Sequence, residues 1–204
     1  MSELAALRTS AGIDRETALA SEDLGRGHLS YLSEALPLLL EDLRALFYRH
    51  LALVANRWSD VLGESHRYPE ALGAFLAQTR KAGQFRALSS LSCLRQGDYH
   101  ALHQRNDDQH IFPLQLVALL SEPGKDFTGG EFVMTEQRPR MQSRPMVLPL
   151  RKGDMAVIAV AQRPHKGTKG FYRVNLKHAI SRVRSGERVG LDLLFHDTKK
   201  RCSL

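Results

Sequence analysis

The feature that most constrains this fold is a series of short β-like runs that fills the chain after residue 86. The runs are rich in β-branched and other apolar residues, and Gly, Pro and Asp separate them at intervals of about 8–15 residues. No helical pattern lies between them, so the crossover helices of a parallel sheet are missing. The pattern therefore favours an antiparallel sandwich or barrel. We expect eight strands, at residues 88–94, 98–104, 112–121, 131–136, 146–150, 154–161, 172–181 and 189–196.

The first 85 residues are expected to be mainly helical. Apolar residues recur at spacings of three and four between positions 36 and 54, the period of a helix with one buried face. Pro37 suits the first turn of that helix. A second helix is expected between Pro69 and Gly83 and a weaker one after Asp14, with residues 58–67 as a polar connection. We expect residues 1–85 to pack on one sheet of a core formed by residues 86–204, giving one compact α+β unit.

Composition excludes several classes of protein. No run of about 18 apolar residues is present that would span a bilayer. The first 20 residues lack the basic and then apolar segments of a secretory signal. Two cysteines, Cys93 and Cys202, are too few for a disulfide framework. We therefore expect a cytoplasmic protein with no membrane association.

Charge is distributed unevenly along the chain. Residues 1–137 carry 13 basic and 18 acidic side chains, whereas residues 138–188 carry 13 basic and only 2 acidic ones. A positive second half indicates an anionic ligand, either a small carboxylate or phosphate or a nucleic-acid backbone. A solvated basic surface is the alternative interpretation.

Two histidines and an arginine have the spacing of a known kind of metal site. His103 lies in a strand-like run, His178 follows about 75 residues later, and Arg188 lies ten residues beyond His178. In such a site two imidazoles hold one face of an iron, and the arginine pairs with the carboxylate of a co-substrate. Nine histidines are present, so the spacing alone has little specificity.

The residues around these positions extend the similarity over nearly the whole chain. The segments concerned read GDYHALHQ, FPLQLVALLSEPGKDFTGGEF, PLRKGDMAVIA and KHAISRVRSGERVGL, and the helical front reads ALPLLLEDLRALFYRHLALVANRW. In this order they resemble a bacterial family of Fe(II)/2-oxoglutarate-dependent oxygenases related to prolyl-4-hydroxylases. The resemblance implies a double-stranded β-helix, or jelly roll, with iron between its two sheets.

The resemblance also assigns roles to individual residues. His103 matches the first iron ligand and His178 the distal one, and Arg188 matches the residue that binds the far carboxylate of 2-oxoglutarate. Gly129 and Gly130 match a tight turn of the family, where a positive φ or a close backbone approach requires glycine. No catalytic side chain is implied beyond the metal centre itself.

The sequence departs from the family at the third iron ligand. Family members carry Asp two residues after the first His, and Arg105 stands there in this chain. Strand alternation predicts that Arg105 points to the same face as His103, where iron needs an anion. Three outcomes follow: Asp107 or Asp108 replaces the missing carboxylate, iron binds through two histidines with co-substrate and water, or the site has lost its metal. We assign Asp107 as a provisional ligand. The bulk of Arg105 argues against a halogenase.

Two further positions distinguish this chain within the family. Leu94 stands where members carry a Tyr that helps to hold the co-substrate. His100 is expected to face away from His103 by strand alternation, which makes it a weaker ligand candidate.

Two classes of function are consistent with these residues. The first is an oxygenase that hydroxylates or demethylates an unidentified substrate. The alternative is a non-catalytic or repurposed protein of the same fold that binds an anionic partner, including nucleic acid. Arg182 and Arg188 have the Arg-x5-Arg spacing of alkylation-repair oxygenases, but so Arg-rich a segment meets that spacing by chance.

Overall fold

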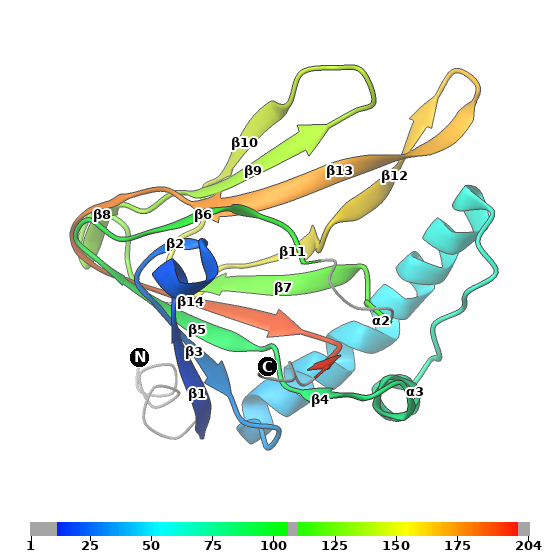
Figure 1. Ribbon diagram of the computed structural model, residues 1–204, viewed down its shortest axis with the longest axis horizontal. Helices are drawn as coiled ribbons and strands as arrows, with labels where there is room; N and C mark the ends of the chain where they lie inside the picture. The colour runs from blue at the N-terminus through cyan, green and yellow to red at the C-terminus, as the bar shows by residue number, and fades with distance from the viewer. Residues whose placement is uncertain (1–11, 106–109, 200–204) are drawn as a thin grey trace.

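Two antiparallel sheets form the body of the protein in a computed structural model that describes residues 12–105 and 110–199 (Figure 1). The larger sheet has the order β1 (Ile13–Ala18), β3 (His28–Leu32), β5 (Ser90–Arg95), β14 (Val183–Leu194), β7 (Leu114–Leu119) and β11 (Met155–Ala159), and β8 (Phe127–Gly129) pairs with β14. The smaller sheet has the order β10 (Arg144–Leu148), β9 (Phe132–Gln137), β13 (Gly170–Ile180), β6 (Tyr99–His103) and β2 (Gly25–Arg26), and β12 (Gln162–Gly167) pairs with β13.

The strand order defines a double-stranded β-helix. Along the chain, β5, β7, β11 and β14 enter the larger sheet, and β6, β9, β10 and β13 enter the smaller one. The first and last of these eight strands, β5 and β14, are neighbours. The predicted jelly roll is therefore confirmed, and all eight expected strands are present with ends shifted by a few residues.

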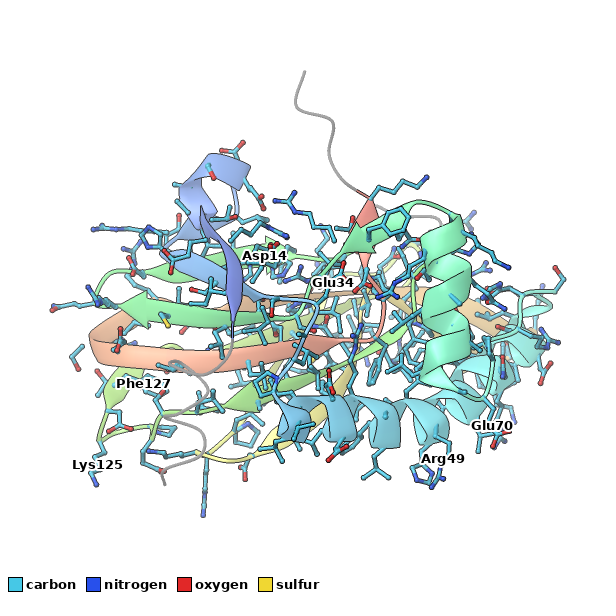
Figure 2. The ribbon with its side chains drawn as sticks, turned by 90° about the horizontal axis from the view of Figure 1, so that it is seen from below. Asp14, Glu34, Arg49, Glu70, Lys125 and Phe127 are labelled. Carbon is cyan, nitrogen blue, oxygen red and sulfur yellow. The ribbon has the colours of Figure 1, made fainter. Side chains whose placement is uncertain are left out.

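The helices cover the outer face of the larger sheet. The long helix α2 (Leu38–Leu62) and the short helix α3 (Leu72–Lys81) pack there through a cluster around Tyr48, Phe75 and Phe112. Figure 2 shows the two helices beside the strands. The strand β7 is buried along its whole length because one set of its side chains meets the helices and the other set meets the smaller sheet. None of the helices within the described residues is both long enough and apolar enough to cross a bilayer.

Three expectations for the front of the chain are wrong. The weak helix after Asp14 is instead β1, which pairs with β3, so this region contributes strands as well as helices. Between them lie only a 3-10 turn, Leu19–Glu22, and the short strand β2. The expected connection at residues 58–67 begins too early, because α2 continues through Trp58 to Leu62. The buried face of α2 also differs, since Leu39 and Leu46 are exposed. A last short pair, β4 (Gln84–Arg86) with β15 (Thr198–Lys199), follows the helices.

Candidate active site between the two sheets

The smaller sheet brings two distant histidines into contact. His103 on β6 lies directly opposite His178 on β13, and their ring centroids are 4.2 Å apart. Both side chains are buried and face the larger sheet. Because cross-strand partners share one face of a sheet, the pairing of β6 with β13 places both rings inside the jelly roll.

A third histidine joins them through an irregularity in β6. The register runs from His178 opposite His103 to Ile180 opposite His100, so two steps on β13 match three steps on β6. This extra residue is a β-bulge, which turns a side chain to the other face. The ring of His100 therefore stacks on His103 at 3.9 Å between centroids. The expectation that His100 faces away from His103 is wrong for this reason.

Burial keeps these imidazoles neutral. Burial and the positive charge of Arg105 lower the pKa of His103 to about 4, and the hydrogen bond that the ring donates to the Ala101 carbonyl opposes that shift. Burial likewise holds the pKa of His178 well below its ordinary value, with His103 and Arg105 acting in the same direction. All three rings are therefore uncharged near neutral pH, which is the state in which imidazole binds a metal.

One hydrogen bond sets the tautomer of His103. Its Nδ1 lies 2.9 Å from the carbonyl oxygen of Ala101, which only accepts, so Nδ1 carries the proton. The lone pair is then on Nε2, which is buried and has no hydrogen-bond partner among the described residues. The Nε2 of His100 has none there either. A neutral ring held by a carbonyl at Nδ1, with its Nε2 left open, has the arrangement found in metal-binding histidines.

The larger sheet presents polar residues to these rings. Gln115 on β7 has its Nε2 3.5 Å from Nε2 of His178. Asp192 on β14 lines the same interior space, together with His100, His178 and Arg188, in a cavity of about 10 Å³. Burial raises the pKa of Asp192, while the nearby Arg105 and Arg188 oppose that rise. Asp192 is a site residue that the sequence analysis missed.

Arg188 reaches the cavity from β14, as its place in the sequence implied. Its side chain is 2% exposed, and its Nε donates a hydrogen bond to the carbonyl of Gly130 at 2.8 Å. Burial lowers the pKa of Arg188 to about 10, against the pull of Asp192. The guanidinium also lines a second pocket of about 660 Å³ between the β8 turn and the segment after β10. A cation between this pocket and the imidazoles is suited to an anion.

The glycine turn beside Arg188 has the predicted character. Gly129 and Gly130 both have positive φ, at 71° and 62°. A Cβ on Gly130 would lie 2.9 Å from Cδ of Arg188, and one on Gly129 would lie 2.4 Å from the carbonyl oxygen of Arg182. Glycine is required here for both the backbone conformation and the close approach.

Arg105 lies just beyond the end of β6, so strand alternation no longer fixes its direction. Its Nη2 is 3.9 Å from Oδ2 of Asp192, and both side chains are about 15% exposed. Its charge nevertheless lowers the pKa of all three site histidines, so the guanidinium lies close to them. Among the described residues, its ion-pair partner therefore comes from the opposite sheet.

The predicted ligand Asp107 lies outside the described residues, as does Asp108. In the part of the chain that the structure describes, no three His, Cys, Asp or Glu side chains are arranged to hold a metal ion. The donors available there are the imidazoles. The open Nε2 of His103 and the neutral state of His178 fit a divalent metal such as iron, with its remaining positions left to other ligands. Leu94 is fully buried on β5 and offers no hydroxyl to a co-substrate.

These features define a jelly-roll protein with a buried histidine cluster flanked by two arginines. A family model for oxygenases, described as catalysing oxidative methylation of damaged DNA, matches residues 27–198. This chain is 38% identical to each of two uncharacterized proteins of Mycobacterium tuberculosis, MT2286 of strain CDC 1551 and Rv2227 of strain H37Rv. Each alignment covers 158 residues, which is 78% of this chain and 68% of the relative. The chain belongs to this oxygenase family, named Oxygenase-NA.

Similar solved structures are more distant. A prolyl-4-hydroxylase from Pseudomonas putida is 14% identical to this chain, with a TM-score of 0.46, and the comparison covers 97% of each chain. A 2OG-Fe(II) oxygenase-family oxidoreductase from Burkholderia pseudomallei is 21% identical with a TM-score of 0.38, over 57% of this chain and less than half, 46%, of that one. The strand order described above, and not these likenesses, defines the fold.

Proposed function

We propose that this chain is an Fe(II)/2-oxoglutarate-dependent oxygenase in which His103 and His178 hold the iron and Arg188 binds the far carboxylate of 2-oxoglutarate. The observation that carries the proposal is that His103 contacts His178 across the smaller sheet, and that His178 and Arg188 line one buried cavity. Asp107 stays a candidate third ligand. Membership of an oxygenase family supports this chemistry.

The roles of the protein's own groups follow from their surroundings. His103 and His178 supply neutral nitrogen donors, and the Ala101 carbonyl fixes the ring of His103. Arg188 supplies a charge-assisted pair of hydrogen bonds to a carboxylate, and the Gly130 carbonyl holds its guanidinium in place. The enclosing sheets exclude bulk water from the reacting atoms. When bound, the iron would supply the activation of O₂ that hydroxylation requires.

We further propose damaged DNA as the substrate class, with hydroxylation or demethylation of a base as the reaction. The family description supports this, and so does the charge of the smaller sheet. Its two long hairpins, β9–β10 and β12–β13, extend beyond the barrel in Figure 1. They carry exposed basic residues suited to phosphates, namely Arg140, Arg144, Lys166, Lys169 and Lys177.

Anaerobic calorimetry tests the metal and co-substrate assignments. Fe(II) binding should be lost in His103→Ala and in His178→Ala, and kept in the control His50→Ala, which changes an exposed histidine on α2. 2-Oxoglutarate binding should weaken at least tenfold in Arg188→Lys, which keeps the charge but loses the planar fork, and should be unchanged in the exposed control Arg184→Lys. Iron binding that survives both histidine substitutions contradicts the proposal.

The DNA assignment has its own test. Binding to a random oligonucleotide should weaken steeply as salt concentration rises, because lysines and arginines release counterions from the phosphates. Lys166→Gln combined with Lys169→Gln should reduce that slope. Salt-independent binding, or none, would leave the oxygenase proposal in place and remove DNA as its substrate.

A further inference from the structure

A second pocket lies at the end of the jelly roll opposite to β8, next to Arg105. It has a volume of about 250 Å³ and lies between the last turns of α2, the segment that follows that helix, and the strand β12. In Figure 1 this is the end where α2 and the β12–β13 hairpin approach each other, away from β8. Contacts of α2 with both β12 and β13 confirm the approach.

Arg105 connects this pocket to the buried cavity. Its side chain lines the pocket, and its Nη2 lies 3.9 Å from the carboxylate of Asp192, which lines the cavity with His178. The 660 Å³ pocket approaches the same cavity from the β8 end through Arg188. The cavity is therefore flanked by two pockets at opposite ends, one that shares Arg188 with it and one whose Arg105 pairs with Asp192 of the cavity lining. If Arg188 holds the co-substrate, the pocket at Arg105 is left for the second substrate.

The walls of this pocket indicate the kind of group that it accepts. Trp58 and Tyr68 contribute aromatic surface, and Ile111 and Val160 contribute apolar surface. A volume of about 250 Å³ lies below the usual range for drug-sized ligands, which suits a single planar group. Aromatic and apolar walls of this kind hold bases that have been turned out of a stack.

The rim of the pocket provides charge for an attached phosphate. Arg173 lines the pocket and pairs with Glu64, and both side chains are at least one-third exposed. Arg163 also lines it and pairs with Glu136, which a second arginine, Arg138, already contacts. An exposed ion pair contributes little free energy, so an incoming phosphate is able to take over Arg173.

We infer that this pocket binds a nucleobase, with the adjoining 5′ phosphate at Arg173. The inference rests on the proposed function, because it gives the second substrate the pocket opposite the co-substrate. The ligand is a base with its phosphate. A single DNA strand and a free mononucleotide both offer these two groups.

Trp58 makes the inference directly measurable. It is the only tryptophan of the chain, so intrinsic tryptophan fluorescence reports on this pocket alone. The unmodified protein, without iron or 2-oxoglutarate, is titrated with dAMP, with a short single-stranded oligonucleotide and with inorganic phosphate. We expect saturable quenching by one or both nucleotide probes and none by phosphate. Quenching by the oligonucleotide alone assigns the site to a DNA strand, and quenching by dAMP alone assigns it to free nucleotide.

Two exposed arginines form a matched pair of variants. Arg173→Gln removes the rim charge and should weaken nucleotide binding about tenfold, the loss of one charge-assisted hydrogen bond. Arg49→Gln, on α2 and outside the pocket lining, should leave the quenching curve unchanged. Ala161→Leu fills the pocket and should abolish quenching, with thermal unfolding used to confirm that the variant is folded.

Absence of quenching by both nucleotide probes, or quenching that neither Arg173→Gln nor Ala161→Leu alters, overturns the inference. The titration needs no metal and no co-substrate. A negative result together with normal iron and 2-oxoglutarate binding therefore refutes the pocket alone, whereas loss of iron binding with normal quenching refutes the oxygenase proposal alone.

Discussion

The ion pair between Arg105 and Asp192 is expected to couple the two sheets energetically. The two charged groups are 3.9 Å apart and about 85% enclosed. At that separation two unit charges attract by about 4 kcal/mol for an effective dielectric of about 20. Arg188 also acts on Asp192 and compensates it in part when Arg105 is removed. We therefore expect a coupling energy of about 2–4 kcal/mol.

A double-mutant cycle measures this coupling. The four proteins are the unmodified chain, Arg105→Met, Asp192→Asn and the double variant, and the free energy of unfolding is taken from urea denaturation. Each single change should destabilise the fold, because it leaves one enclosed charge unpaired. The loss of unfolding free energy in the double variant should be smaller than the sum of the two single losses, by at least about 2 kcal/mol.

The exposed pair between Arg95 and Glu187 is the control. The Nε of Arg95 lies 3.3 Å from the Glu187 carboxylate, but the Arg95 side chain is 79% exposed. The coupling energy of this pair should therefore stay below about 1 kcal/mol. If the coupling between Arg105 and Asp192 is no larger than that of the control, Arg105 is not paired inside the barrel. Arg105 would then not be the partner of Asp192 at the cavity.

Three other perturbations test separate parts of the molecule. His196 is buried and accepts a hydrogen bond from the Phe112 N–H, and burial with two nearby arginines lowers its pKa to about 3 from 6.5. The unfolded chain therefore binds a proton at this histidine first, and His196 alone should lower the free energy of unfolding by about 4–5 kcal/mol as pH drops from about 6.5 to 3. Urea unfolding should show a smaller pH-dependent fall in His196→Asn. Gly130→Ala should displace Arg188 and weaken 2-oxoglutarate binding in calorimetry, and unchanged affinity would separate the turn from the co-substrate. Arg105→Asp should strengthen Fe(II) binding; if Asp107 is already a ligand, Asp107→Ala should abolish binding instead, and insensitivity to both would place the metal elsewhere.

The jelly roll was predictable because its signals are local. Apolar runs bounded by turn residues mark the eight strands of the double-stranded β-helix, and the 3.6-residue period marks α2 and α3. The additional strands β8 and β12 were not among the expected ones. The strand β1 was not predictable in this way. Its sequence, IDRETA, has no alternating apolar face, and it forms because β3 offers an edge with which it pairs.

Site residues were predictable where sequence position alone determines them. His103, His178 and Arg188 follow from the resemblance, and the structure brings them together. His100 was missed because a β-bulge leaves no mark on the period of a strand. Asp192 was missed because its partner, Arg105, comes from the opposite sheet, and a pairing of that kind depends on the complete topology.

The charges around the cavity are consistent with an arginine at the position where the resemblance implies an aspartate. The three imidazoles are neutral, so Arg105, Arg188 and Asp192 set the local charge, and two cations face one anion. Such a site repels a bare divalent metal and attracts a dicarboxylate, because like charges close together in an enclosed space repel strongly. If 2-oxoglutarate binds here as proposed, its two carboxylates reverse the sign of the local charge, and metal binding should become more favourable. By thermodynamic linkage the metal should then tighten 2-oxoglutarate binding by the same factor. We therefore expect the binding of the metal to depend on the co-substrate.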